Sequence, residues 1–491
     1  MMRSLKQKTV QGVKWEVASK VLQKIISVAS FAVLARMLDP ASFGLFALAF
    51  VAIDALNLVK SFGLDSALIQ RKESIQKASD TTFFLVVASG VTIFLTCQFA
   101  APFVAVFFKN PEVTPVVRAL GFIFLLNTVG KVPAALLAKQ MEYRKIAIVN
   151  LSGAIANATL AILIALVSPT VWCLVWAYVI KQVVITVLNW KMSGYRLTWS
   201  FDLTVARELF GFGKFMMGLS FLWYLTANLD DIVIGKMLGT VMVGYFAVSN
   251  NVANFINTHF TQLVGGVMFP AYSRIQHDEE TLQRVYLKTI KFVSMLSIPF
   301  SIGLICLSKE FVFTLYGAKW EPIIPLVRLY GFVQLISPIK ACSSPIFMAK
   351  GRPDYSFNLT LFNLIVRIPL LIFLIRQIGL IGSVVSELVA VILFAPVNLG
   401  LAKKIVRFRY GQLFQQLSAA LFSGLAMIGT ILLLEGFFAI LWPVSVNYHL
   451  FNFFFLGVSG IAAYFGTFYI LDRSSTLEAK QLLLGWKTRV A

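Results

Sequence analysis

Residues 36–47 read RMLDPASFGLFA, and residues 236–247 read KMLGTVMVGYFA. The two stretches share Met-Leu, Gly and Phe-Ala at an offset of 200 residues. Two further matches follow in the same order: residues 115–122 with 325–332, and residues 138–143 with 349–355. One match of this kind arises easily by chance. Three in order, with a slowly increasing offset, indicate an internal repeat.

The composition around this repeat is that of a membrane protein. Of the 491 residues, 58% are hydrophobic and only 13% are charged, and the mean hydropathy is +0.81. A soluble domain has about a quarter of its residues charged. The composition therefore excludes a cytosolic enzyme and a disordered protein.

Fourteen apolar stretches are long enough to cross a bilayer, which takes roughly 17–25 residues per helix. We therefore predict an all-α integral membrane protein with fourteen transmembrane helices. The predicted spans lie near residues 17–38, 43–60, 81–108, 115–138, 146–167, 170–190, 211–235, 241–269, 289–308, 322–348, 356–377, 379–402, 413–440 and 448–471.

The distribution of positive charge predicts the orientation of these helices. The chain has 43 Lys and Arg against 22 Asp and Glu, a net charge of +21. With the N-terminus in the cytoplasm, 29 of the 43 cations fall in inner segments, 6 at outer ends and 8 within spans. Cytoplasmic loops are enriched in Lys and Arg, so we predict that both termini are cytoplasmic. The basicity is explained without a nucleic-acid partner.

The repeat predicts how the helices are organised. Residues 1–200 and 201–410 form two bundles of six helices each, and residues 411–491 add two helices and a cytoplasmic tail. An even number of helices returns each copy to the same side, so the copies are parallel, with a pseudo-two-fold axis along the membrane normal. Transporters built in this way bind substrate between the halves and work by alternating access.

Polar side chains repeat within the second and eighth spans at helical spacing. Such a stripe predicts a cavity wall, although polar residues also hydrogen-bond between packed helices. The members are Asp54, Asn57 and Ser61 in the first copy and Asn250, Asn254, Asn257 and Thr261 in the second, and the last three of these match the first copy at an offset of 200.

Cations within or near the ends of spans are candidates for binding an anionic substrate. Arg367, in the middle of the eleventh span, is the strongest of these candidates. The first span has two lysines, which snorkelling toward headgroups would also explain. The two repeat-related arginines at outer helix ends are equally well explained as interface anchors. The full set is Lys20, Lys24, Arg36, Arg118, Arg328 and Arg367.

Four carboxylates in or near the spans are candidates for ion coupling: Asp54, Asp230, Asp231 and Glu387. A buried carboxyl group can carry a proton or bind Na⁺, so coupling to H⁺ or Na⁺ is left open. An ion pair with Arg367 is the alternative explanation for Glu387.

The sequence predicts a protein that is not an enzyme and has no cofactor. Its three histidines have no metal-ligand spacing, and its four cysteines lie in apolar stretches. No nucleotide-binding motif points to an ATP-driven pump. The outer loops are short, which disfavours a membrane glycan polymerase or ligase.

Several short motifs together resemble the Wzx-type polysaccharide flippases, and more narrowly the branch of colanic acid and teichuronic acid exporters. This family belongs to the multidrug/oligosaccharidyl-lipid/polysaccharide (MOP) superfamily, and the resemblance covers nearly the whole chain. The motifs are Lys14-Trp15, Leu34-Ala35-Arg36, Phe43-Gly44, Phe62-Gly63, Ile69-Gln70-Arg71-Lys72-Glu73 and Phe269-Pro270-Ala271.

The resemblance implies two six-helix bundles around a central cavity lined mainly by helices 1, 2, 7 and 8. It implies a bacterial inner-membrane flippase that moves an undecaprenyl-pyrophosphate-linked oligosaccharide to the periplasmic leaflet for surface polysaccharide synthesis. Membrane lipids and the polysaccharide polymerase and export machinery are the implied partners. A cation-coupled multidrug antiporter of the same superfamily is the main alternative, and a glycan polymerase or ligase is the second.

Overall fold

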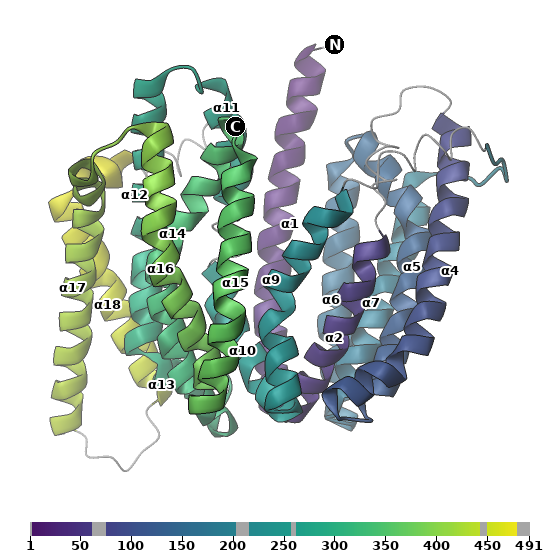
Figure 1. Ribbon diagram of the computed structural model, residues 1–491, viewed down its shortest axis with the longest axis horizontal. Coiled ribbons are helices and arrows are strands. Elements are labelled where there is room, and N and C mark those ends of the chain that lie inside the picture. The colour runs from purple at the N-terminus through teal and green to yellow at the C-terminus, as the bar shows by residue number, and fades with distance from the viewer. Residues whose placement is uncertain (1, 61–74, 203–215, 257–261, 442–448, 479–491) are drawn as a thin grey trace. The chain divides into compact units, whose positions relative to one another are not determined.

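The computed structural model describes residues 2–60, 75–202, 216–256, 262–441 and 449–478 (Figure 1). These residues form helices and connecting segments, without a strand among them. The predicted all-α class is therefore confirmed.

Twelve stretches of the described residues are long and apolar enough to cross a membrane. They correspond to twelve of the fourteen predicted spans. The other two predicted spans fall on α9 and on α10 with α11, and none of these helices is among the twelve. The polar residues Asn228, Asp230 and Asp231 lower the hydropathy of α9, and α10 has only 17 residues. The count of fourteen and the cytoplasmic termini stay predictions.

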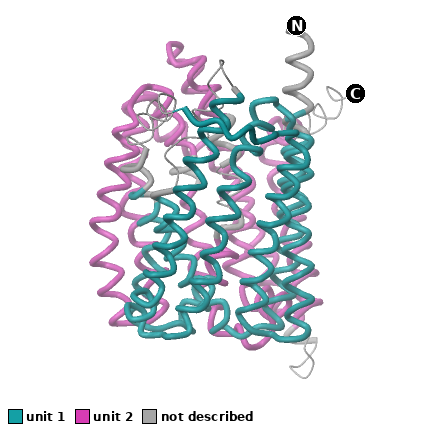
Figure 2. The backbone as a smooth tube through the Cα atoms, turned by 90° about the vertical axis from the view of Figure 1, so that its right-hand side faces the viewer, with its two compact units in different colours: residues 1–247 teal, residues 248–491 magenta. Residues whose placement is uncertain are grey.

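The chain divides into two compact units, residues 1–247 and 248–491 (Figure 2). Unit 1 contains α1 (Met2–Met37), α2 (Pro40–Lys60), α4 (Ile75–Phe108), α5 (Val113–Lys139), α6 (Tyr143–Val167), α7 (Val171–Ser193) and α9 (Met216–Met237). Helix α10 (Thr240–Ile256) begins in unit 1. Unit 2 contains α11 (Gln262–Arg274), α12 (Glu279–Cys306), α13 (Ser308–Leu315), the 3₁₀ helix η2 (Ala318–Ile323), α14 (Ile324–Ala349), α15 (Pro353–Ile378), α16 (Ile381–Val406), α17 (Tyr410–Leu441) and α18 (His449–Leu471).

Large apolar side chains are exposed along the outer faces of the helices. On α4, Phe99, Phe103 and Val106 are each about three-quarters exposed, and Leu433 on α17 is 77% exposed. The three α4 residues are spaced by one helical turn and form a continuous apolar stripe. Contiguous apolar surface of this kind requires an apolar solvent. The protein is thus a multi-pass membrane protein.

The two copies of the opening motif meet each other in unit 1. A Cβ atom placed on Gly44 of α2 would lie 1.9 Å from the carbonyl oxygen of Thr240, and one on Gly244 of α10 would lie 1.9 Å from that of Pro40. The four positions pair at an offset of 200 in both directions. Gly44 meets Thr240, and their counterparts Gly244 and Pro40 meet in the same way. Such a reciprocal contact is typical of a local two-fold relation.

A second repeat-related contact holds the segment that leaves the sixth helix of each half. In unit 1, the Gln76 side chain of α4 donates to the carbonyl of Arg196, at 2.7 Å. In unit 2, the Gln283 side chain of α12 donates to the carbonyl of Arg407, at 3.2 Å. Each glutamine lies at the start of an equivalent helix and binds the backbone just beyond α7 or α16.

Unit 1 adds a buried carboxylate to this contact. Asp80, one turn beyond Gln76, is fully buried. It accepts hydrogen bonds from the Tyr195 hydroxyl at 2.6 Å, the Ser200 hydroxyl at 3.0 Å, and the backbone N–H and hydroxyl of Thr198. These bonds fix residues 195–200 against the start of α4. Burial, together with the hydrogen bond to Asp80, raises the pKa of the Tyr195 phenol above its usual range.

Candidate functional site

Three of the four predicted ion-coupling carboxylates gather in unit 1, where α2 packs against α9. Asp54 of α2 lies near enough to Asp231 of α9 for their charges to interact, and Asp230 adds to the same field. The Asn57 side chain donates to Asp54 at 3.5 Å. The predicted stripe on the second span therefore faces the carboxylates of the seventh.

An aromatic wall from α7 and α9 surrounds Asp54. The charge of Asp54 reaches the hydroxyls of Tyr178 and Tyr224. The Tyr224 hydroxyl donates to the carbonyl of Val51 on α2, at 3.2 Å. The Lys181 ammonium lies 5.0 Å from the centre of the Tyr178 ring, within the range of a cation–π contact.

Within this cluster, the carboxylate of Asp231 is incompletely satisfied. Its Oδ1 atom is buried and has no hydrogen-bond partner among the described residues. Asp230, the next residue, is 7% exposed. A buried carboxylate oxygen without a donor is stabilised by a proton or a cation. This geometry suits the exchange of a small cation.

The strongest predicted substrate-binding cation, Arg367, is paired in unit 2. Its guanidinium on α15 lies 3.3 Å from the carboxylate of Glu387 on α16, and the Arg367 side chain is 9% exposed. This is the ion pair that the sequence offered as the alternative for Glu387. A phosphate that binds Arg367 would meet a guanidinium that is already paired with Glu387.

The predicted cations of α1 lie at the surface of the helix. Lys20 forms an ion pair with Glu16 at 2.8 Å, and the two side chains are 67% and 46% exposed. Lys24, one turn further along α1, is partly buried. Between them, the Gln23 amide donates to Ser19, whose hydroxyl donates to the carbonyl of Ala147 on α6.

The other predicted substrate-binding residues are divided between the two units. Arg36, Arg118 and Arg328 are exposed. The Arg328 guanidinium donates to the Ser308 hydroxyl at 3.2 Å, while the Arg118 carbonyl accepts from the Gln98 amide. Asn250 is partly buried on α10. The remaining two are Asn254, which lies in α10 but whose side chain is outside the described part, and Asn257, which lies beyond the described residues together with Ser61 and Thr261.

Sequence reasoning missed Tyr178 and Tyr224, which lie near Asp54, and Lys181, which lies over the Tyr178 ring. Lys181 was one of the eight cations counted within the spans, and its mid-span position was a usable signal. The two tyrosines gave none, because tyrosine is common in membrane helices.

A protein-family model described as "Polysaccharide biosynthesis protein" matches residues 33–325, more than half of the chain. The chain belongs to this family. The resemblance to polysaccharide exporters inferred from the short motifs is confirmed.

Curated relatives include proteins of the predicted exporter branch. The lipopolysaccharide biosynthesis protein WzxC of Escherichia coli (strain K12) is 28% identical over 392 residues, 79% of this chain and 80% of WzxC. The teichuronic acid biosynthesis protein TuaB of Bacillus subtilis (strain 168) is 25% identical over 365 residues, 72% of this chain and 74% of TuaB.

Solved structures show the same fold. The lipid II flippase MurJ in an inward closed conformation superposes with a TM-score of 0.74, covering 95% of this chain and 100% of MurJ at 14% identity. An inward-facing multidrug resistance MATE family transporter of the MOP superfamily has a TM-score of 0.62, covering 78% of this chain and 96% of the transporter at 16% identity. At these identities the likeness establishes the fold alone.

Proposed function

We propose that the protein is a transporter that flips a lipid-linked oligosaccharide across the membrane for surface polysaccharide synthesis. The membership in the polysaccharide biosynthesis family carries this conclusion. The names of the relatives support it: ExoT of Rhizobium meliloti (strain 1021), 26% identical over 347 residues, is a succinoglycan biosynthesis transport protein. MurJ, named as a lipid II flippase, provides the matching fold. Because these relatives are named for transport, the protein is a transporter and not an enzyme.

The finer features of this proposal come from the sequence. The substrate is an undecaprenyl-pyrophosphate-linked oligosaccharide, moved from the cytoplasmic to the periplasmic leaflet of a bacterial inner membrane. Fourteen helices with both termini in the cytoplasm work by alternating access, and a polysaccharide polymerase takes up the product. Guanidinium groups suit the pyrophosphate, and amide side chains suit the sugar hydroxyls.

We further propose that the carboxylates of unit 1 couple transport to H⁺ or Na⁺. Asp54, Asp230 and Asp231 lie within one another's field, and the Oδ1 atom of Asp231 has no donor in the described part of the chain. Binding one cation would relieve their mutual repulsion. Glu387 is a weaker candidate for coupling because it is already paired with Arg367.

A cation-coupled multidrug antiporter is the second candidate, favoured by the similarity to the inward-facing MATE transporter. Drug susceptibility of a deletion strain separates the two. A flippase predicts unchanged susceptibility together with lost surface polysaccharide, and an antiporter predicts the reverse.

The direct test is a deletion strain complemented with variants at matched membrane expression. Loss of the protein should leave the lipid-linked intermediate on the cytoplasmic leaflet. Arg367→Ala should reduce export more than Lys319→Ala, and Asp54→Asn should abolish its dependence on the ion gradient. Normal polysaccharide in the deletion strain, in the absence of a paralogue, would refute the proposal.

A further inference from the structure

A polar pocket of about 430 Å³ lies within unit 2, between the first turns of α12, the first turns of α17 and the segment that follows α18. Small-molecule sites are typically about 300–1,000 Å³. The predicted substrate-binding and ion-coupling residues are all absent from its lining. The pocket therefore needs an explanation of its own.

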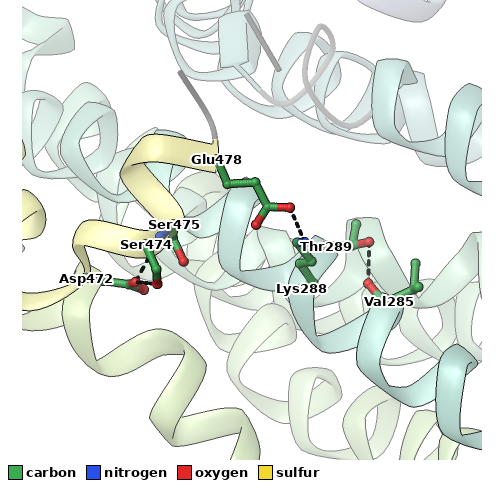
Figure 3. Close-up of polar contacts among 7 residues, drawn as sticks. All are labelled: Val285, Lys288, Thr289, Asp472, Ser474, Ser475 and Glu478. Atoms are coloured by element: carbon green, nitrogen blue, oxygen red, sulfur yellow. Dashed lines mark hydrogen bonds and ion pairs between the residues drawn. The ribbon is translucent and has the colours of Figure 1, made fainter. Parts of the chain in front are cut away.

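Three cations of α12 line the pocket: Arg284, Lys288 and Lys291. Their spacing of four and three residues places them on one helix face. Lys288 is paired with Glu478, as Figure 3 shows. Lys291 is paired with Asp472. Both carboxylates lie in the segment that follows α18.

Arg284 is different from the two lysines. It makes no ion pair with a carboxylate in the part of the chain that the structure describes. Its guanidinium donates to the neighbouring Thr281 hydroxyl at 3.1 Å, and its side chain is exposed. The guanidinium has five N–H donors and presents two of them together to a phosphate. Arg284 is thus the cation of this pocket that is best placed to bind an anion.

The remaining lining restricts which anion fits. Glu280 and Glu478 also line the pocket, and Lys288 and Lys291 are already paired with Glu478 and Asp472. Arg284 is therefore the cation left to take an anion. The two glutamates would repel a doubly charged phosphate monoester, whereas the single charge of a phosphodiester matches the single guanidinium of Arg284. Glutamates and the amides of Gln415 and Gln416 accept hydrogen bonds from hydroxyl groups. A phosphodiester that carries hydroxyls matches this set.

The surroundings indicate that the ligand is a lipid. On α17, the exposed Phe422 lies two turns beyond Gln415 on the same helix face. Acyl chains could follow this face while the headgroup occupies the pocket. Basic pockets between transmembrane helices on the cytoplasmic side bind anionic lipid headgroups, and this end of α12 is in the predicted cytoplasmic segment.

We propose that the pocket between α12, α17 and the segment following α18 binds the headgroup of a singly charged, hydroxyl-bearing phospholipid, namely phosphatidylglycerol. Arg284 binds the phosphate, with Lys288 in support, and the glutamines and glutamates bind the glycerol hydroxyls. Because the bound lipid bridges α12, α17 and the segment after α18, it stabilises unit 2.

The test uses the full-length protein, purified in detergent and titrated with phosphatidylglycerol or with phosphatidylcholine of the same acyl chains. The binding constant and the rise in melting temperature are measured for each. Phosphatidylglycerol should bind and stabilise the protein, while phosphatidylcholine should do neither. Arg284→Gln should weaken phosphatidylglycerol binding by about tenfold, because one charge-assisted hydrogen-bonding group is lost. Arg376→Gln, an exposed arginine outside the pocket, should leave it unchanged.

A second variant, expected to tighten binding where Arg284→Gln weakens it, completes the test. Glu478→Gln removes one negative charge and releases Lys288, so phosphatidylglycerol should bind more tightly than to the wild type. Equal binding of the two lipids, or no effect of Arg284→Gln, would overturn the proposal. Soluble glycerophosphoglycerol distinguishes the source: binding as tight as that of the lipid would show a site for a soluble phosphodiester and refute the lipid.

Discussion

The reciprocal contact between Gly44 and Gly244 predicts that neither glycine tolerates a methyl group. In Gly44→Ala, the added Cβ would lie 1.9 Å from the carbonyl oxygen of Thr240. Carbon and oxygen atoms in contact need about 3.3 Å, so α2 and α10 would have to separate by roughly 1.4 Å. The atom in the way belongs to the backbone, which cannot swing aside as a side chain can.

The free energy of this change can be approximated. Overpacking typically costs about 1–3 kcal/mol, and a backbone clash belongs at the upper end. Alanine is about 1 kcal/mol more favourable than glycine inside a helix. We therefore expect Gly44→Ala to destabilise the protein by about 2 kcal/mol. Gly244→Ala should have a similar effect because its Cβ meets the Pro40 carbonyl at the same distance.

The measurement is thermal unfolding of the purified protein, followed by tryptophan fluorescence. Gly429→Ala is the matched control, since this glycine of α17 has no atom within 4 Å of an added Cβ and should be neutral or stabilising. The double variant Gly44→Ala/Gly244→Ala should cost less than the sum of the two, because one separation of the helices relieves both clashes. If Gly44→Ala melts at or above the Gly429→Ala control, the contact does not exist as described.

Three further predictions concern buried polar groups. Arg367→Met and Glu387→Met should each destabilise the protein by about 3 kcal/mol, because a single change leaves one charge of the pair unmatched. The double variant should be less destabilised than either single variant. Denaturant unfolding of the three variants checks this, and a loss of stability in the double variant equal to the sum of the two single losses would contradict it. Tyr195→Phe should lower stability by roughly 1.5–3 kcal/mol through the lost bond to the Asp80 carboxylate, with faster hydrogen exchange in residues 194–202, and unchanged exchange would disprove the role of this bond. Burial alone would raise the pKa of Asp472, but hydrogen bonds, led by that from the Lys291 side chain, hold this pKa below its usual range. The stabilising contribution of the ionised carboxylate is therefore present above the unfolded pKa of about 3.9 and is lost as pH falls through the folded pKa. Stability between pH 6 and pH 3 should accordingly fall less in Asp472→Asn than in the wild type.

The helical architecture could be predicted because apolar length alone identifies a membrane helix. The prediction of spans is weakest where charged side chains fall within a helix. Asp230 and Asp231 interrupt the apolar character of α9, whereas residues 257–261 of the predicted eighth span lie outside the described residues. Hydropathy averages over a window and cannot register such interruptions.

The contacts of the site were harder to predict than its residues. Periodicity placed Asp54 and Asn57 on one face of a helix, but it could not show that the face meets α9. The same sequence reasoning chose Arg367 because of its depth in the span and did not name Lys181. The structure adds what depth cannot show: Arg367 has a carboxylate partner at 3.3 Å, and Lys181 lies over an aromatic ring beside Asp54.

The two halves keep one contact and differ in the chemistry around it. Gln76 and Gln283 bind equivalent backbone positions, but one turn further the buried side chain is Asp80 in unit 1 and Leu287 in unit 2. The predicted ion-coupling carboxylates also differ between the two units. In unit 1, Asp54 and Asp231 have no ion pair among the described residues, whereas Glu387 in unit 2 is neutralised by Arg367.

This division matters for a transporter built from two related halves. A carboxylate that is already paired gains little from binding a cation, because its partner satisfies the charge in every state. Carboxylates that repel one another gain much more, and their affinity for a cation changes whenever helix movement alters their separation. Under the proposed coupling, Asp54 of α2 and Asp231 of α9, which have no ion pair among the described residues, would respond in this way, since the glycine contact joins α2 to α10, the helix that follows α9. Any movement of α2 at that contact would therefore be felt at Asp54 and Asp231 together.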